Sequence, residues 1–190
     1  MRVEGGEKLA NIPSGKGVIF AANHASPLDP IVVTAALTPL GRFTPLYYGS
    51  RPKGEYSMFP VGKHLYGGAL FRAWGAYPVY RKQSNYSLAL RHHIWFLKHG
   101  RAVCFFPEGG WNADGTKKHA RPGIVHLARL GNAVIVPTKI EGVTERNLRV
   151  VFGEPFSIDD LERDTTPSAE AIDPAIHLSQ KIMDRVYALN

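Results

Sequence analysis

The stretch from Phe20 to Pro30, FAANHASPLDP, guides the interpretation of the whole chain. An apolar run ends in His24, and Asp29 follows five positions later. An imidazole can accept a proton near neutral pH, and a carboxylate on its other nitrogen can orient the ring and stabilise the imidazolium. Pro27 and Pro30 stiffen the intervening turn. The stretch therefore indicates a general base, and the alternative from these residues alone is a helix-capping aspartate beside an exposed loop histidine.

On both sides of this stretch, short β-branched and aromatic runs alternate with helix-length segments. That alternation predicts a single α/β domain over residues 1–190, with a mostly parallel central sheet flanked by helices. The predicted strands are Val18–Ala22, Phe43–Tyr48, Ala76–Tyr80, Ala102–Phe106, Ala133–Val136 and Leu148–Phe152. The predicted helices are Pro30–Leu37, Gly62–Trp74, Ser84–His99, Pro122–Leu130 and Pro174–Leu189.

Helix boundaries are expected where the local chemistry favours them. Asp29 is the expected N-cap of the first helix, and Ser84 that of the longest one, which Gly100 should end. Gly131 should close the following helix. The last helix is expected to cover the sheet with an apolar face formed by Ile176, Ile182, Val186 and Leu189.

The composition favours an ordinary globular protein with anionic partners. The hydrophobic share of 44% and the charged share of 21% indicate neither a disordered nor a fibrous chain. A formal net charge of +7 points to nucleic acid, acidic lipid headgroups or phosphorylated small molecules. The basic residues are scattered, and we find no nucleic-acid-binding motif, so we expect an anionic membrane surface as partner and no nucleic acid.

The sequence predicts no cofactor, no metal site and a reducing compartment. Cys104 is the single cysteine and lies in an apolar run, which excludes a disulfide framework. His92 and His93 are adjacent on a predicted helix and point in different directions, which argues against shared metal ligation. We see neither a signal peptide nor the roughly twenty apolar residues that a spanning helix needs. We therefore expect a cytoplasmic protein, peripheral at the inner face of the membrane.

Four conspicuous features follow predicted strands: Asn23-His24, Arg81, Glu108 and Pro137. Because the carboxyl ends of parallel strands face one crevice, these segments are expected to meet at one site. The irregular stretches expected to form its loops are Gly49–Pro60 and Pro107–Arg121.

Each feature also has a simpler interpretation. Glu108, followed by Gly109 and Gly110, would let the backbone approach a ligand and offer amides to an anion, or it could form an ordinary glycine turn. Arg81 could pair with a phosphate or be a solvated surface residue. The aromatic and basic stretch Tyr56–Tyr80 could lie in a membrane interface, and core packing is the commoner role of such residues.

Taken together, four segments resemble the motif blocks of the glycerolipid acyltransferase family, which includes the lysophosphatidate acyltransferases. The blocks are NHASPLD (Asn23–Asp29, the histidine-x4-aspartate motif), GAYPVYR (Gly75–Arg81), FPEGG (Phe106–Gly110) and VIVP (Val134–Pro137). They occur in the family's order, and the resemblance covers about residues 18–155, the motif-bearing core. It implies transfer of a fatty acyl group from an acyl thioester, acyl-CoA or acyl carrier protein, to a lysolipid hydroxyl. The implied acceptor is 1-acylglycerol-3-phosphate, in phospholipid biosynthesis.

The resemblance also implies roles for individual residues. His24, oriented by Asp29, would remove the proton of the acceptor hydroxyl, with no covalent acyl-enzyme. Supporting positions would be Asn23, Ser26 and Pro137. The residues implied or considered for acceptor binding are Arg81, Glu108, Gly109, Gly110, Trp111, Lys117 and Arg121.

One departure concerns the acceptor headgroup. The family usually continues its glutamate-glycine pair with threonine, arginine and serine, whereas this chain has Gly110, Trp111 and Asn112. Candidates to replace the missing positive charge are Lys117, Lys118 and Arg121, although a lysine is not equivalent to an arginine fork. A non-phosphate acceptor and a non-catalytic lipid-binding or membrane-binding module are therefore the two alternatives to a phosphate-specific enzyme.

Overall fold

The apolar residues before His24 form strand β2 (Val18–Ala22), and every one of them is buried. A strand covered on both faces is an uninterrupted apolar run, as VIFAA is. The computed structural model describes residues 1–50, 72–80, 83, 85–110, 119–142, 147–165 and 173–190.

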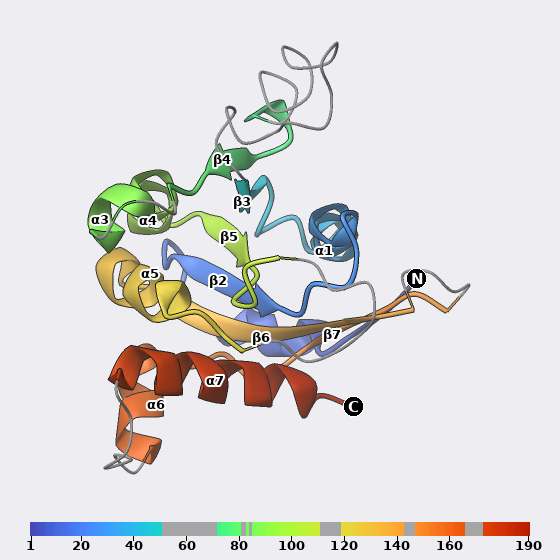
Figure 1. The fold of residues 1–190 in the computed structure, drawn as a ribbon. Coiled ribbons are helices and arrows are strands. Elements are labelled where there is room, and N and C mark those ends of the chain that lie inside the picture. Colours follow the sequence, from blue (N-terminus) through green and yellow to red (C-terminus); the bar gives the residue numbers. More distant parts are fainter. Residues whose placement is uncertain (51–71, 81–82, 84, 111–118, 143–146, 166–172) are drawn as a thin grey trace.

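Within these described residues, seven strands form one sheet in the order β1-β7-β6-β2-β5-β3-β4 (Figure 1). The other strands are β1 (Arg2–Glu4), β3 (Leu46–Ser50), β4 (Ala76–Pro78), β5 (Ala102–Phe105), β6 (Val134–Glu141) and β7 (Arg149–Phe152). Only the pair of β6 and β7 is antiparallel among them. The predicted α/β fold with a mostly parallel sheet is therefore confirmed.

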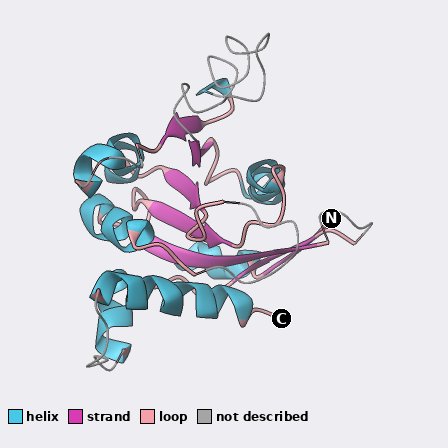
Figure 2. Ribbon diagram, viewed as in Figure 1, coloured by secondary structure: helices cyan, strands magenta, loops and turns pink. Residues whose placement is uncertain are grey.

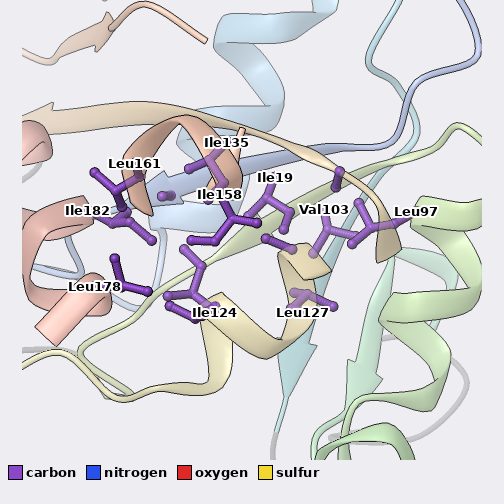
Figure 3. Packing of buried hydrophobic residues seen from close by; sticks show 14 of the residues in the cluster. Ile19, Leu97, Val103, Ile124, Leu127, Ile135, Ile158, Leu161, Leu178 and Ile182 are labelled. Carbon is purple, nitrogen blue, oxygen red and sulfur yellow. The ribbon is translucent and has the colours of Figure 1, made fainter. Parts of the chain in front are cut away.

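Helices cover both faces of this sheet (Figure 2). They are α1 (Asp29–Leu37), α3 (Tyr86–Ala89), α4 (Arg91–Lys98), α5 (Gly123–Gly131), α6 (Ile158–Asp164) and α7 (Pro174–Tyr187), with 3₁₀ helices at Gly6–Asn11 and Thr38–Leu40. Successive side chains of β2 point to opposite faces. Ile19 packs with residues of α4 to α7, including Ile124 and Ile182 (Figure 3), and Phe20 packs on the other face with Val33 of α1.

Two of the predicted helix caps are wrong. Leu28, and not Asp29, is the N-cap of α1, because the Asp29 side chain bonds to residues before the helix. The predicted helix Ser84–His99 is interrupted at Leu90, which separates α3 from α4. Asn85 caps its start by accepting a hydrogen bond from the Ser87 N–H, and Ser84 itself lies outside the described residues. Gly100, with φ of 67°, ends the helix as predicted.

Two other helix ends differ from the prediction. Gly131 belongs to α5, and Asn132 adopts the left-handed conformation that ends it. In α7, Ile182 and Val186 are buried as expected, but Ile176 is 47% exposed. The expected apolar face of α7 is thus confirmed only in part.

Strand boundaries also differ from the prediction at several places. The third strand begins at Leu46, after Pro45, which lacks the N–H that a sheet ladder needs. β4 ends at Pro78, and the Tyr80 N–H donates to the Ala89 carbonyl instead. β6 runs to Glu141, so Pro137 lies inside the strand and not after it. The predicted helix Gly62–Trp74 and the loop Gly49–Pro60 lie mostly outside the described residues.

Neither β1 nor α6 is among the predicted elements. β1 has only three residues and pairs with β7 from the far end of the chain, where Arg149 and Glu4 form an ion pair of 2.7 Å. The Ser157 hydroxyl caps α6, accepting from the Asp160 N–H. Elements this short depend on their partners and not on a periodic pattern of their own.

Candidate active site

Asn23 connects the end of β2 to the neighbouring strand β6. Its amide Nδ2 donates to the Ile140 carbonyl at 2.9 Å, and the Ile140 N–H donates to Asn23 Oδ1 at 2.8 Å. This reciprocal pair satisfies both groups of the side chain and holds the backbone immediately before His24.

The Asp29 carboxylate organises the turn that follows. Its Oδ2 accepts three hydrogen bonds, from His24 Nδ1 at 2.9 Å, from Ala25 N at 2.7 Å and from Ser26 N at 2.9 Å. The carboxylate is fully buried and lies in the first turn of α1, where the helix dipole favours a negative charge. Ser26 Oγ accepts from the Leu28 N–H at 3.1 Å, so Ser26 contributes to the turn.

These contacts determine which nitrogen of His24 can act as a base. An ionised carboxylate only accepts hydrogen bonds, so Nδ1 carries the proton and Nε2 carries the lone pair. The His24 side chain is 15% exposed, whereas that of Asp29 is not exposed at all. An oriented base with a buried carboxylate behind it is the arrangement that proton abstraction needs.

Phe106, directly after β5, stacks on the His24 ring with centroids 4.1 Å apart and planes inclined by 20°. The strands β5 and β2 are neighbours, so the sheet places the two rings together. Phe106 belongs to the FPEGG segment, but the sequence does not show that it would contact the histidine.

Glu108 lies in the turn after Phe106 and is only 5% exposed. The Tyr187 hydroxyl, from the last turn of α7, donates to Glu108 Oε1 at 2.6 Å. Burial, followed by the hydrogen bond to Glu108 and its charge, raises the pKa of Tyr187. The hydroxyl is therefore protonated and donates. No sequence pattern points to Tyr187, because it lies far from every motif.

Gly109 lies in the same turn, and the Arg121 side chain packs against it. Gly109 has φ of 74°, and a Cβ there would lie 2.6 Å from Arg121 Nε. Only glycine lets the arginine side chain cross the backbone at this point. The Arg121 N–H donates to the Pro107 carbonyl at 2.9 Å, and Gly110 follows on the same turn. The exposed Arg121 side chain therefore lies against Gly109.

The structure brings together part of the predicted site. One cluster contains His24, Asp29, Asn23 and Ser26. Phe106 stacks on His24 and leads into the turn from Glu108 to Gly110, against which Arg121 packs. Pro137 is placed differently, since it pairs in register with Ala21 of β2 and lies before the strand end. The predicted site residues outside the described part of the chain are Arg81, Trp111, Lys117 and Lys118.

Two features are absent from the described residues. These residues contain no group of three or more His, Cys, Asp or Glu side chains that could hold a metal ion. They also contain no helix with the length and apolar character needed to span a bilayer.

The sequence profile of the Acyltransferase family matches residues 2–141, and the chain belongs to that family. The protein is thus an acyltransferase, and the resemblance to the glycerolipid acyltransferases is confirmed. The fold is similar to that of the 1-acyl-sn-glycerophosphate (LPA) acyltransferase PlsC from Thermotoga maritima, with a TM-score of 0.60 and 20% sequence identity. The similarity covers 98% of this chain and 70% of that one. A search of curated proteins found no match.

Proposed function

We propose that this acyltransferase moves a fatty acyl group from an acyl thioester, acyl-CoA or acyl carrier protein, to the hydroxyl of a lysolipid. The proposed acceptor is 1-acylglycerol-3-phosphate, the substrate named for the similar Thermotoga maritima enzyme. The observation that carries the proposal is the hydrogen bond of 2.9 Å from His24 Nδ1 to the buried Asp29 carboxylate, which leaves Nε2 as a base.

In the proposed reaction, His24 Nε2 takes the acceptor's hydroxyl proton while the oxygen attacks the thioester carbonyl carbon. The tetrahedral intermediate collapses, the carbon–sulfur bond breaks, and the thiolate takes the proton back from Nε2. The products are an ester and a thiol, and no covalent acyl-enzyme forms. Buried Asp29 stabilises the imidazolium between the two proton transfers, and such general-base assistance is worth about a hundredfold to ten thousandfold in rate.

The turn after β5 is the proposed acceptor site. Its glycine pair allows a ligand to approach the backbone, and the Arg121 guanidinium beside Gly109 supplies positive charge for a phosphate. In this proposal, Glu108 accepts hydrogen bonds from glycerol hydroxyls. We propose that Arg121 replaces the positive charge of the arginine that usually follows the glutamate-glycine pair in this family.

An apolar groove along α1 is the proposed position of an acyl chain. It has a volume of about 340 Å³, and its lining includes Pro30, Ile31, Ala35 and the exposed Trp74. Pro30 follows Asp29 in the first turn of α1, so the groove lies along the helix that carries Asp29. Apolar walls suit an alkyl chain, because its burial removes apolar surface from water.

We further propose that the enzyme works as a peripheral protein at an anionic membrane surface, at the inner face of the membrane. The net charge of +7 supports this, as do the exposed apolar residues Leu28 and Ile31 in and just before α1. Binding to vesicles with anionic lipids should weaken as salt rises, since the attraction of exposed charges is screened. Salt-independent binding in a sedimentation assay would contradict the electrostatic part.

The central experiment is an acyltransferase assay with acyl-CoA or acyl carrier protein thioesters and a panel of lysolipids. The native chain should form ester product, and His24→Ala should lose at least about a hundredfold in kcat. A matched control is His99→Ala, which removes an exposed histidine at the end of α4 and should keep full activity. Product formation unaffected by His24→Ala would reject the mechanism. If no combination of donor and acceptor gives product and the chain still binds vesicles, the protein would be a lipid-binding module.

The headgroup is tested with acceptors that differ only in the phosphate. Arg121→Gln should raise the KM for 1-acylglycerol-3-phosphate at least about tenfold and leave that for 1-acylglycerol unchanged, because hydrogen bonds to charged groups contribute about 1.5–3 kcal/mol. Arg101→Gln, at the opposite end of β5, is the control. Equal use of both acceptors by the native enzyme would show that it does not recognise the phosphate, and would favour the alternative of a non-phosphate acceptor.

A further inference from the structure

We infer that Tyr187 is a positioning residue for Glu108, which makes the C-terminal helix α7 part of the acceptor site. The inference rests on the proposed function, in which Glu108 contacts the acceptor. The matched family region ends at residue 141, so it includes neither Tyr187 nor any other part of α7.

The contact has the geometry of a strong, charge-assisted hydrogen bond. The Tyr187 hydroxyl lies 2.6 Å from Glu108 Oε1, and Glu108 is 5% exposed. Distances near 2.6 Å are typical of O–H donors to carboxylates. A buried carboxylate needs such donors, because its removal from water is otherwise costly. The raised pKa of Tyr187 keeps the donor protonated at physiological pH.

Further contacts hold α7 against the same turn and the adjacent strand. The Ser179 hydroxyl donates to the Arg121 carbonyl at 2.9 Å, and Gln180 Oε1 accepts from the Ala120 N–H at 3.3 Å. Beyond the helix, Lys139 Nζ in β6 donates to the Leu189 carbonyl at 2.6 Å. Both described acceptor side chains, Glu108 and Arg121, therefore belong to segments bonded to α7.

The hydrogen bond defines the direction of the carboxylate. When Oε1 is held by Tyr187, rotation of the Glu108 carboxylate is restricted and its second oxygen keeps one orientation. A carboxylate that is already ordered binds an acceptor more tightly, because a mobile side chain loses conformational entropy when the acceptor binds. Loss of the hydroxyl should therefore weaken acceptor binding without altering the base at His24.

The test compares Tyr187→Phe with Tyr86→Phe, which removes the hydroxyl of another partly buried tyrosine, stacked on His126 in the helical layer. Isothermal titration calorimetry measures the affinity for a short-chain 1-acylglycerol-3-phosphate, and the assay gives KM and kcat. Tyr187→Phe should weaken acceptor affinity and raise the acceptor KM about tenfold, with donor KM unchanged. Tyr86→Phe should leave all these values unchanged.

A double-mutant cycle separates positioning from general packing. In a Glu108→Gln background, Tyr187→Phe should cause no further loss of acceptor affinity, because the partner is already altered. Additive losses, or a lowered melting temperature with unchanged acceptor affinity, would overturn the inference. Because calorimetry needs no turnover, the two proposals can fail separately. Weakened acceptor binding in Tyr187→Phe, in a chain that forms no product, would refute the proposed reaction and still support the role of Tyr187.

Discussion

The Phe106 ring lies face to face with the His24 imidazole, with centroids 4.1 Å apart and planes inclined by 20°. This contact confines the imidazole to the plane in which Nδ1 meets Asp29, so the direction of Nε2 is also defined. The face of an aromatic ring also favours a cation, and in the proposed reaction His24 becomes one. The imidazole is therefore held from two sides, by a carboxylate and by a ring.

Replacing Phe106 by Leu should lower kcat about twofold to tenfold and leave the acceptor KM unchanged. Aromatic stacking contributes about 0.5–1.5 kcal/mol beyond burial, which corresponds to that range of rates. Steady-state kinetics measure the effect. Phe105→Leu is the matched control, because that ring packs in the core on the other face of the sheet. Equal losses in both variants would mean that stacking has no specific role.

The Asp29→Asn variant should lose at least about a hundredfold in kcat. An asparagine offers only one accepting oxygen and can present N–H groups to Nδ1, which favours the tautomer whose proton is on Nε2. Activity assays and a thermal melt measure the outcome. The control is Asp173→Asn, the N-cap of α7, which preserves a capping oxygen and should keep activity. Full activity in Asp29→Asn would show that the carboxylate does not set the tautomer.

In the Asn23→Ala variant, stability and activity should fall together. Two hydrogen bonds to Ile140 are lost, at about 1 kcal/mol each, and the turn before His24 loses its connection to β6. Urea unfolding measures the loss of stability, and steady-state kinetics measure the loss of kcat. Asn85→Ala removes a helix cap at the start of α3 and should lower stability by about 1 kcal/mol with kcat unchanged. A fully active Asn23→Ala would contradict this positioning role.

His93 should make the fold sensitive to mild acid. The residue is fully buried on α4, and burial, the main cause, lowers its pKa from 6.5 to about 4, with the Tyr48 backbone partly offsetting this. Between these values the unfolded chain binds a proton that the folded chain does not, so stability falls as the pH drops below about 6.5. The accumulated loss at pH 4 is about 3 kcal/mol.

Urea unfolding from pH 7.5 to 4.5 tests this dependence. His93→Leu should flatten the part of the slope that this histidine causes, whereas His99→Leu, at an exposed position, should retain it. A slope that is identical in native protein and His93→Leu would contradict the assignment. The difference in slope between the native protein and His93→Leu measures the contribution of His93, and His99→Leu controls for the loss of a histidine as such.

The features that arise from local order could be predicted from the sequence. The alternation of short apolar runs and helix-length segments predicted the α/β fold, and an uninterrupted apolar run such as VIFAA marks a strand buried on both faces. The spacing between His24 and Asp29 also acts locally, since five residues and two prolines suffice to close that turn. Even there, the capping role expected of Asp29 was wrong, because its carboxylate bonds backward to the turn and not to the helix.

The distant residues that complete the candidate site are brought together by the folded chain. Asn23 and Ile140 are separated by 117 positions, and Glu108 and Tyr187 by 79. Such contacts leave no periodic or spacing signal in the sequence, because they depend on strand order and on the docking of α7 over the sheet. The pairing of His24 with Asp29 could therefore be predicted from one short segment, whereas the ring that stacks on His24 and the hydroxyl that donates to Glu108 required the folded chain.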